Sequence, residues 1–220
     1  MPEPTPVLPE VLAQIQSLPA SDRPLIICDV DEVILHMILH LEEYLNNKGM
    51  HFLNHSYRLT GNIAHTEDGR PVPADQVKRH LIAFFDEVNH QQAMVPDANT
   101  ALAELTDQWD IVLLTNLPGS HNKPVRETLL RGMGIPYPVL TYSGPKGGAV
   151  AALAGGRAHP VVFIDDSPTN HRSVQASLPA SVQIQFIADQ RFLNSVEPEP
   201  HIDLLSGDWR ETSRFIRSIL

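Results

Sequence analysis

The side chains of this sequence that are able to do chemistry stand directly after apolar runs. Acidic pairs follow two of these runs, a threonine and an asparagine end a third, and a lysine precedes the last pair. The residues are Asp29, Asp31, Thr115, Asn116, Lys146, Asp165 and Asp166. Carboxylates crowded at one place repel one another unless a cation lies among them, and Mg2+ favours a few carboxylates with water and a phosphate oxygen. We therefore expect a magnesium site that takes a phosphate group.

The elements that must bring these residues together are predicted to be buried parallel strands. Apolar runs of strand length occur at 25–31, 110–116, 137–143, 160–167 and 182–188, the last alternating more and expected towards an edge. Helical patterns lie at 8–18, at 97–105 behind the capping residue Asp97, at 124–133, at 147–154 and at 209–219. This alternation predicts an α/β fold, a three-layer, doubly wound, Rossmann-like parallel sheet. In such sheets ligands bind at the carboxyl ends of the strands, where the polar residues lie.

One region interrupts the alternation of strands and helices. Residues 36–94 contain two helical patterns, at 38–45 and 77–88, separated by a polar stretch rich in turns. We interpret this region as a small, mostly helical cap inserted into a core made of residues 1–35 and 95–220. Closing such a cap would expel water and suit a small substrate.

The two aspartates of the first strand can divide the work of transferring a phosphoryl group. An ionised carboxylate can attack phosphorus and form an aspartyl phosphate, the role we expect for Asp29. Its neighbour Asp31 can protonate the leaving oxygen and later activate water, as general acid and then general base. Thr115 and Asn116 are expected to hold phosphoryl oxygens, while Lys146 offsets the gathered negative charge.

The order of these motifs resembles the haloacid dehalogenase superfamily. The segments LIICDVDEV, IVLLTN, GPKGG and VVFIDD occur in the family's order between residues 25 and 167. The resemblance implies Mg2+ held by Asp29, the backbone carbonyl of Asp31 and Asp166, with Asp165 assisting, and a cap inserted after the first motif. Asp31 argues against the dehalogenase branch, which lacks an acid there. Glu32 departs from the pattern, because many members have glycine at that place.

Composition limits the classes of partner and compartment. The chain has 220 residues, 42% of them hydrophobic, and a formal net charge of −10, which disfavours nucleic acid and anionic membranes as partners. Its single cysteine, Cys28, excludes an intramolecular disulfide and is expected to be a buried small hydrophobic residue rather than a thiolate nucleophile. The start MPEPTPVLPE resembles no signal peptide, and no apolar run is long enough to span a membrane. We expect a cytoplasmic protein.

Other residues admit two interpretations. The pairs His36 and His40, and His51 and His55, have a spacing that can place two imidazoles on one helical face, but no third zinc ligand is specified, so ordinary histidines are favoured. Asn116 either binds substrate or caps the following turn. His171 is expected to begin a helix. The glycines of GPKGG lack the spacing of a nucleotide phosphate-binding loop.

The function expected from these residues is magnesium-dependent hydrolysis of a phosphomonoester, on a small soluble phosphorylated metabolite. A phosphomutase or another phosphotransferase would use the same residues. A non-catalytic module that binds a phosphate or a partner on the same fold is the alternative from another class. Nothing in the sequence names the substrate or the oligomeric state.

Overall fold

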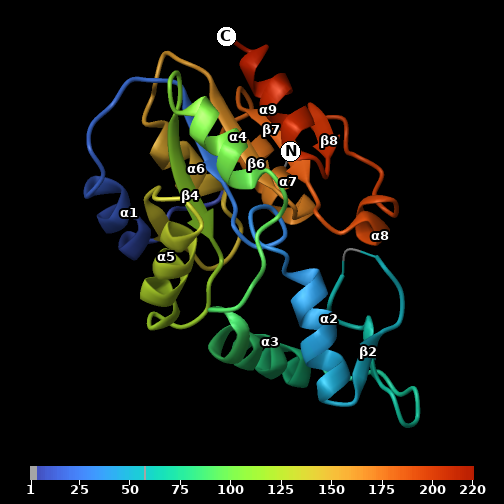
Figure 1. Cartoon of the computed structure of the whole chain (residues 1–220). Helices are drawn as coiled ribbons and strands as arrows, with labels where there is room; N and C mark the ends of the chain where they lie inside the picture. The colour runs from blue at the N-terminus through green and yellow to red at the C-terminus, as the bar shows by residue number, and fades with distance from the viewer. Residues whose placement is uncertain (1–3, 57) are drawn as a thin grey trace.

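A six-stranded parallel sheet forms the centre of the molecule. The computed structural model describes residues 4–56 and 58–220. Within these residues the strand order is β5-β4-β1-β6-β7-β8, and every neighbouring pair is parallel (Figure 1). The strands are β1 (Leu25–Cys28), β4 (Asp110–Thr115), β5 (Val139–Thr141), β6 (Val161–Asp165), β7 (Val182–Phe186) and β8 (Leu204–Ser206). The predicted parallel α/β sheet is confirmed.

Helices cover both faces of the sheet because successive strand residues point to opposite sides. Ile26 and Cys28 of β1 pack in one apolar cluster, with α4, α5 and α9, whereas Leu25 and Ile27 pack in the other, with α1, α6 and α7. The helices are α1 (Pro9–Gln16), α4 (Ala98–Leu105), α5 (Asn122–Gly132), α6 (Gly147–Ala154), α7 (Pro168–Ser177), α8 (Gln190–Leu193) and α9 (Trp209–Arg217). None of the helices in the described chain is long and apolar enough to cross a membrane.

One local expectation, the capping role of Asp97, needs correction. Asp97 precedes α4 as predicted, but its φ is 64° and its side chain does not cap the helix. Its carboxylate instead accepts a hydrogen bond from Nε of Arg210 at 2.8 Å. The strand predicted at 182–188 is β7, which lies towards an edge as expected, next to the edge strand β8. Strand β8 and helix α8 were missed, since elements of three and four residues carry almost no periodic signal.

The segment inserted after the first motif packs around an apolar cluster of its own. It contains α2 (Ile38–Asn47), β2 (Met50–Phe52), β3 (Ile63–His65) and α3 (Ala74–Val88). The two strands form an antiparallel pair that the sequence analysis did not predict. Figure 1 shows α2, β2 and α3 gathered at one end of the molecule. Phe192 and Ile187 from the core join the same cluster, so the insert is seated on the loop that follows β7.

Candidate active site

The polar residues at the strand ends lie together because their strands are neighbours. Strand β1 lies between β4 and β6, and Asp29 extends its pairing by donating its backbone N–H to the carbonyl of Ile164 at 2.8 Å. Thr115 and Asp165 are the last residues of β4 and β6. Asp29, Asp31 and Asp166 line a cavity of about 500 Å³ whose far side is formed by the insert.

Lys146 joins two of the carboxylates below this cavity. Its side chain is fully buried, and Nζ lies 2.8 Å from Oδ2 of Asp29 and 2.7 Å from Oδ2 of Asp165. The lysine directly precedes α6, whose first residue, Gly147, donates its N–H to Oγ of Ser173 in α7. A Cβ at Gly147 would lie 2.2 Å from the carbonyl oxygen of Ser173. Glycine therefore permits the close helix contact that places the lysine.

Burial governs the protonation of this group. Burial raises the pKa of Asp29 to about 7, although the Lys146 ammonium opposes the shift. Burial alone would lower the pKa of Lys146, but Asp165 and Asp29 together raise it above its ordinary value. The pKa of Asp166 is raised well above its ordinary value by burial and by the charge of Asp29. The single ammonium of Lys146 is thus too little positive charge to keep all of these carboxyl groups readily ionised.

The donor set fits a hard divalent cation. Asp29, Asp165 and Asp166 each offer an oxygen, and these oxygens lie within 4.8 Å of one another. Asp165 already accepts hydrogen bonds at both oxygens, from Lys146, Asn170 and the N–H of Ser167. Within the described residues no cationic side chain pairs with Asp166. Asp29 also has a partner at each oxygen, but Asp29 and Asp166 line the cavity whereas Asp165 is fully buried. Asp29 and Asp166 are therefore the carboxylates best placed as ligands for Mg2+.

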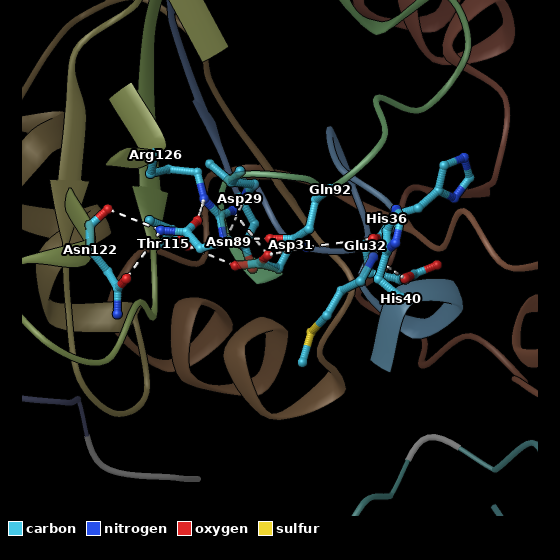
Figure 2. Close-up of polar contacts among 12 residues, drawn as sticks. Asp29, Asp31, Glu32, His36, His40, Asn89, Gln92, Thr115, Asn122 and Arg126 are labelled. Atoms are coloured by element: carbon cyan, nitrogen blue, oxygen red, sulfur yellow. Dashed lines mark hydrogen bonds and ion pairs between the residues drawn. The ribbon is translucent and has the colours of Figure 1, made fainter. Parts of the chain in front are cut away.

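Asp31 belongs to a second buried group, built around Arg126 of α5. Nη1 of Arg126 donates to Oδ1 of Asp31 at 2.9 Å, and Nε2 of Gln92 donates to the same oxygen at 3.1 Å. Oγ1 of Thr115 donates to Oδ2 of Asp31 at 3.3 Å. Figure 2 shows Asp31 between Thr115, Arg126 and Gln92. The sequence analysis placed Thr115 beside the aspartates but missed both Arg126 and Gln92.

Asn116 and Glu32 take structural positions that the sequence left open. Nδ2 of Asn116 donates to the carbonyl of Gly144 at 3.1 Å, so it connects two loops at the cavity rather than capping a turn.

Glu32 is fully buried with a φ of 62°, and its carboxylate accepts three backbone N–H groups, those of Met37, Ile38 and Asp189. Burial raises the pKa of Glu32 to about 7 against the effect of these donors. Glu32 thereby fixes the linker that enters α2.

The remaining candidates are ordinary structural residues. Cys28 is buried in β1, and burial raises the pKa of its thiol, which confirms the hydrophobic interpretation. His171 lies in the first turn of α7, as expected, and its ring contacts Gln183 and the carbonyl of Asp165. His40 accepts from the N–H of Ala93, and His51 lies in β2, not on a helix. The described residues contain no group of three possible metal ligands that includes a histidine.

Comparisons with known proteins agree with this architecture. No family model matches the chain, and no curated protein matches it. Solved structures do. A haloacid dehalogenase-like protein of unknown function from Agrobacterium tumefaciens has 16% identity and a TM-score of 0.61, over 89% of this chain and 98% of that chain.

Two further solved structures cover the same extent of the chain. A putative HAD-hydrolase from Bacillus subtilis, in a structure bound to magnesium, has 14% identity and a TM-score of 0.57, over 88% of this chain and 98% of that chain. A putative beta-phosphoglucomutase from Thermotoga maritima has 13% identity and a TM-score of 0.55, over 90% and 100%. The likeness in fold therefore extends over most of the chain.

Proposed function

We propose that this chain, which has the haloacid dehalogenase-like fold, is a magnesium-dependent phosphomonoester hydrolase that works through a phosphorylated Asp29. The observation that carries the proposal is the position of Asp29, which lines the cavity at the end of the central strand while Lys146 holds one of its oxygens at 2.8 Å. The names of the neighbouring structures, hydrolases and a phosphomutase, support a hydrolase or phosphotransferase.

In the first step a carboxylate oxygen of Asp29 forms a bond to phosphorus while the bond from phosphorus to the ester oxygen breaks. Asp31 gives its proton to the departing oxygen, so the alcohol leaves neutral. In the second step a water oxygen attacks phosphorus, the bond from Asp29 to phosphorus breaks, and Asp31 takes back a proton from the water. Inorganic phosphate and the original enzyme result.

The surrounding residues hold charge in place during both steps. Asp29, Asp166 and the backbone carbonyl of Asp31 would hold Mg2+, which when bound offsets the charge of the phosphoryl oxygens. Lys146 keeps Asp29 oriented and partly neutralised, and Asp165 holds Lys146 from the other side.

Two polar side chains at the end of β4 complete the proposed phosphate site. Thr115 is buried beside Asp31, and Asn116 lines the cavity next to Gly144. We assign both to contacts with the phosphoryl oxygens, Asn116 through its amide and Thr115 through its hydroxyl, which would turn from Oδ2 of Asp31 to the phosphate when substrate binds.

The lining of the cavity supports a small substrate with an apolar alcohol. The insert contributes Met37, Leu59, Leu81 and Phe85, and no lysine or arginine is among the described lining residues. A second phosphate or carboxylate on the substrate would face acidic residues without a cation. We propose that residues 36–94 form a cap over a core of residues 1–35 and 95–220. The proposed substrate is a phosphate ester of a small cytoplasmic metabolite.

The test is a phosphate-release screen over metabolite, alkyl and aryl phosphomonoesters, with and without Mg2+, run beside Asp29→Asn. Asp107→Asn makes the same chemical change at an exposed position and is the matched control. We expect release by the wild type and by the control only, and dependence on Mg2+. A wild type that releases phosphate from no ester, or an equally active Asp29→Asn, would contradict the proposal. Phosphate recovered on a second hydroxyl instead of in water would identify a phosphomutase.

A further inference from the structure

We infer that Arg126 is a positioning residue for the general acid, and that its guanidinium holds Asp31 and the linker leaving the insert as one unit. The inference rests on the proposed function, because it concerns the proton that Asp31 delivers. Arg126 comes from α5 of the core and is fully buried, although arginine is rarely found so. The burial of Arg126 is therefore explained through the groups that its guanidinium contacts.

All three nitrogens of the guanidinium have partners at short distance. Nη1 donates to Oδ1 of Asp31 at 2.9 Å, Nη2 to Oε1 of Gln92 at 2.8 Å, and Nε to Oδ1 of Asn89 at 2.6 Å. The planar group lies 5.9 Å from the centre of the Phe85 ring, and that ring lines the cavity. Three directed bonds from a rigid fork fix the position of each acceptor, which a lysine ammonium on a flexible stem would not do.

The contacts of Asp31 distinguish its two oxygens. Oδ1 accepts from both Arg126 and Gln92, so it has little capacity left to carry a proton. Oδ2 has a single longer contact, 3.3 Å from the hydroxyl of Thr115. Asp31 lines the cavity. We therefore assign the transferred proton to Oδ2, which Arg126 and Gln92 orient by holding the opposite oxygen.

The other two partners of Arg126 belong to the segment that leads from the insert back to the core. Asn89 follows directly after α3, and its Nδ2 donates to the carbonyl of Asn122 in α5 at 3.1 Å. Gln92 lies farther along the same linker and also reaches the carbonyl of His36, in the entering linker, at 3.5 Å. Figure 2 shows these side chains converging on Arg126 and Asp31. The linker thus completes the set of contacts that orients Asp31, because Gln92 bonds both to Asp31 and to Arg126.

The arrangement has a specific consequence for different esters. An ester whose leaving group is a stable anion needs little help from a general acid, whereas an alkyl ester needs the proton as its bond breaks. In the step that phosphorylates Asp29, a residue that positions the acid must therefore matter for alkyl esters and matter little for activated aryl esters. A residue that only stabilises the fold would affect both esters alike.

The experiment compares Arg126→Met with the wild type on 2-phenylethyl phosphate and on 2,4-dinitrophenyl phosphate, in saturating Mg2+. We expect kcat/KM, which reports the phosphorylation of Asp29 and not the later hydrolysis that both esters share, to fall by about 10²-fold or more on the alkyl ester and by less than about fivefold on the dinitrophenyl ester. Arg126→Lys, which keeps the charge without the fork, should lie between Arg126→Met and the wild type on the alkyl ester.

Controls separate positioning from folding. Arg157→Met removes an arginine that contacts a backbone carbonyl and Asp110 away from the cavity, and it should leave the ratio of the two rates unchanged. Gln92→Met removes a donor to Oδ1 without burying an unpaired charge, and it should reproduce the selective loss even if Arg126→Met folds poorly. In an Asp31→Asn background, Arg126→Met should cause no further loss on the alkyl ester.

The outcomes are distinguishable. Equal losses on the two esters in Arg126→Met and Gln92→Met, no loss on either ester, or an additional loss in the Asp31→Asn background would overturn the inference while leaving the proposed function intact. A wild type that hydrolyses neither ester would overturn the proposed function, and the inference with it.

Discussion

The two aspartates of the first motif are each paired with a buried cation, but the two pairs are built differently. Lys146 holds Asp29 with the help of Asp165, and all three residues come from the core beside the ends of β1, β5 and β6. Arg126 holds Asp31 with the help of Gln92, which comes from the linker of the insert. The proposed nucleophile, Asp29, is therefore positioned by the core alone, and the proposed proton donor, Asp31, by the contact between core and insert.

This difference suggests a division of labour. A nucleophile held by the rigid sheet stays ready whatever the insert does, since parallel strands with two covered faces move little. A proton donor held partly by a linker is correct only in one arrangement of the insert. The following predictions test the two pairs, from the largest expected effect to the smallest.

Replacing the nucleophile should have the largest effect. Asp29→Asn removes the attacking carboxylate but leaves Lys146 paired with Asp165, so we expect a folded protein whose kcat falls by about 10⁴-fold or more on every ester. Steady-state phosphate release and circular dichroism measure the two properties. A loss of less than about tenfold would exclude Asp29 as the nucleophile.

Removing the lysine should strongly lower the free energy of unfolding. Lys146→Met leaves Asp29 and Asp165 buried and close together with no ammonium, which should lower the free energy of unfolding by ~3 to 5 kcal/mol. Urea denaturation measures this value. Adding Asp165→Asn should restore part of the stability, because one buried charge is then removed. No recovery in the double variant would contradict this account of the pair.

Removing the arginine should destabilise the protein less. After Arg126→Met, a single carboxylate, that of Asp31, loses its cation, and it keeps the donors Gln92 and Thr115. The uncharged side-chain oxygens of Asn89 and Gln92 also lose a donor. We expect a loss of ~2 to 3 kcal/mol in the free energy of unfolding. Urea denaturation of Arg126→Met and Lys146→Met compares the two losses in the free energy of unfolding. A larger loss for Arg126→Met than for Lys146→Met would reverse the expected order and show that the linker stabilises the whole fold.

The smallest effect concerns the apolar lining of the cavity. Leu81→Arg adds a cation where the insert faces the substrate, so it should favour an ester that carries a remote carboxylate. We expect kcat/KM for 4-(2-carboxyethyl)phenyl phosphate, relative to 4-ethylphenyl phosphate, to rise by about fivefold, which corresponds to a partly exposed ion pair of ~1 kcal/mol. Leu81→Met is the control. An unchanged ratio would place the alcohol of the substrate away from Leu81.

The closeness of Asp29, Thr115 and Asp165 could be predicted from the sequence because of where each residue lies relative to an apolar run. Asp29, Thr115 and Asp165 each end a continuous apolar run, and a parallel sheet brings such ends to one edge. The pairing of Lys146 could not be read from its spacing, since it depends on the close contact of α6 with α7 at Gly147.

The contacts of Arg126 and Gln92 with Asp31 could not be predicted from the sequence, because neither residue follows an apolar run. Arg126 lies inside a helix among other charged residues, and Gln92 lies in a linker with no periodic pattern. Burial of an arginine is a tertiary property, because it depends on α5 meeting the linker after α3. The pair β2 and β3 was missed for a similar reason, since strands of three residues are defined by each other and not by their own sequence.

The central claim, that Asp29 becomes phosphorylated, is tested most directly by trapping the intermediate. An ester that the wild type hydrolyses is mixed with excess enzyme and Mg2+, quenched with acid within a single turnover, and reduced with borohydride, which converts an acyl phosphate to the alcohol. The account predicts homoserine at position 29 in the peptide that contains β1, and none in Asp29→Asn. Release of the alcohol during the first turnover with no homoserine at position 29 at any quench time would contradict it.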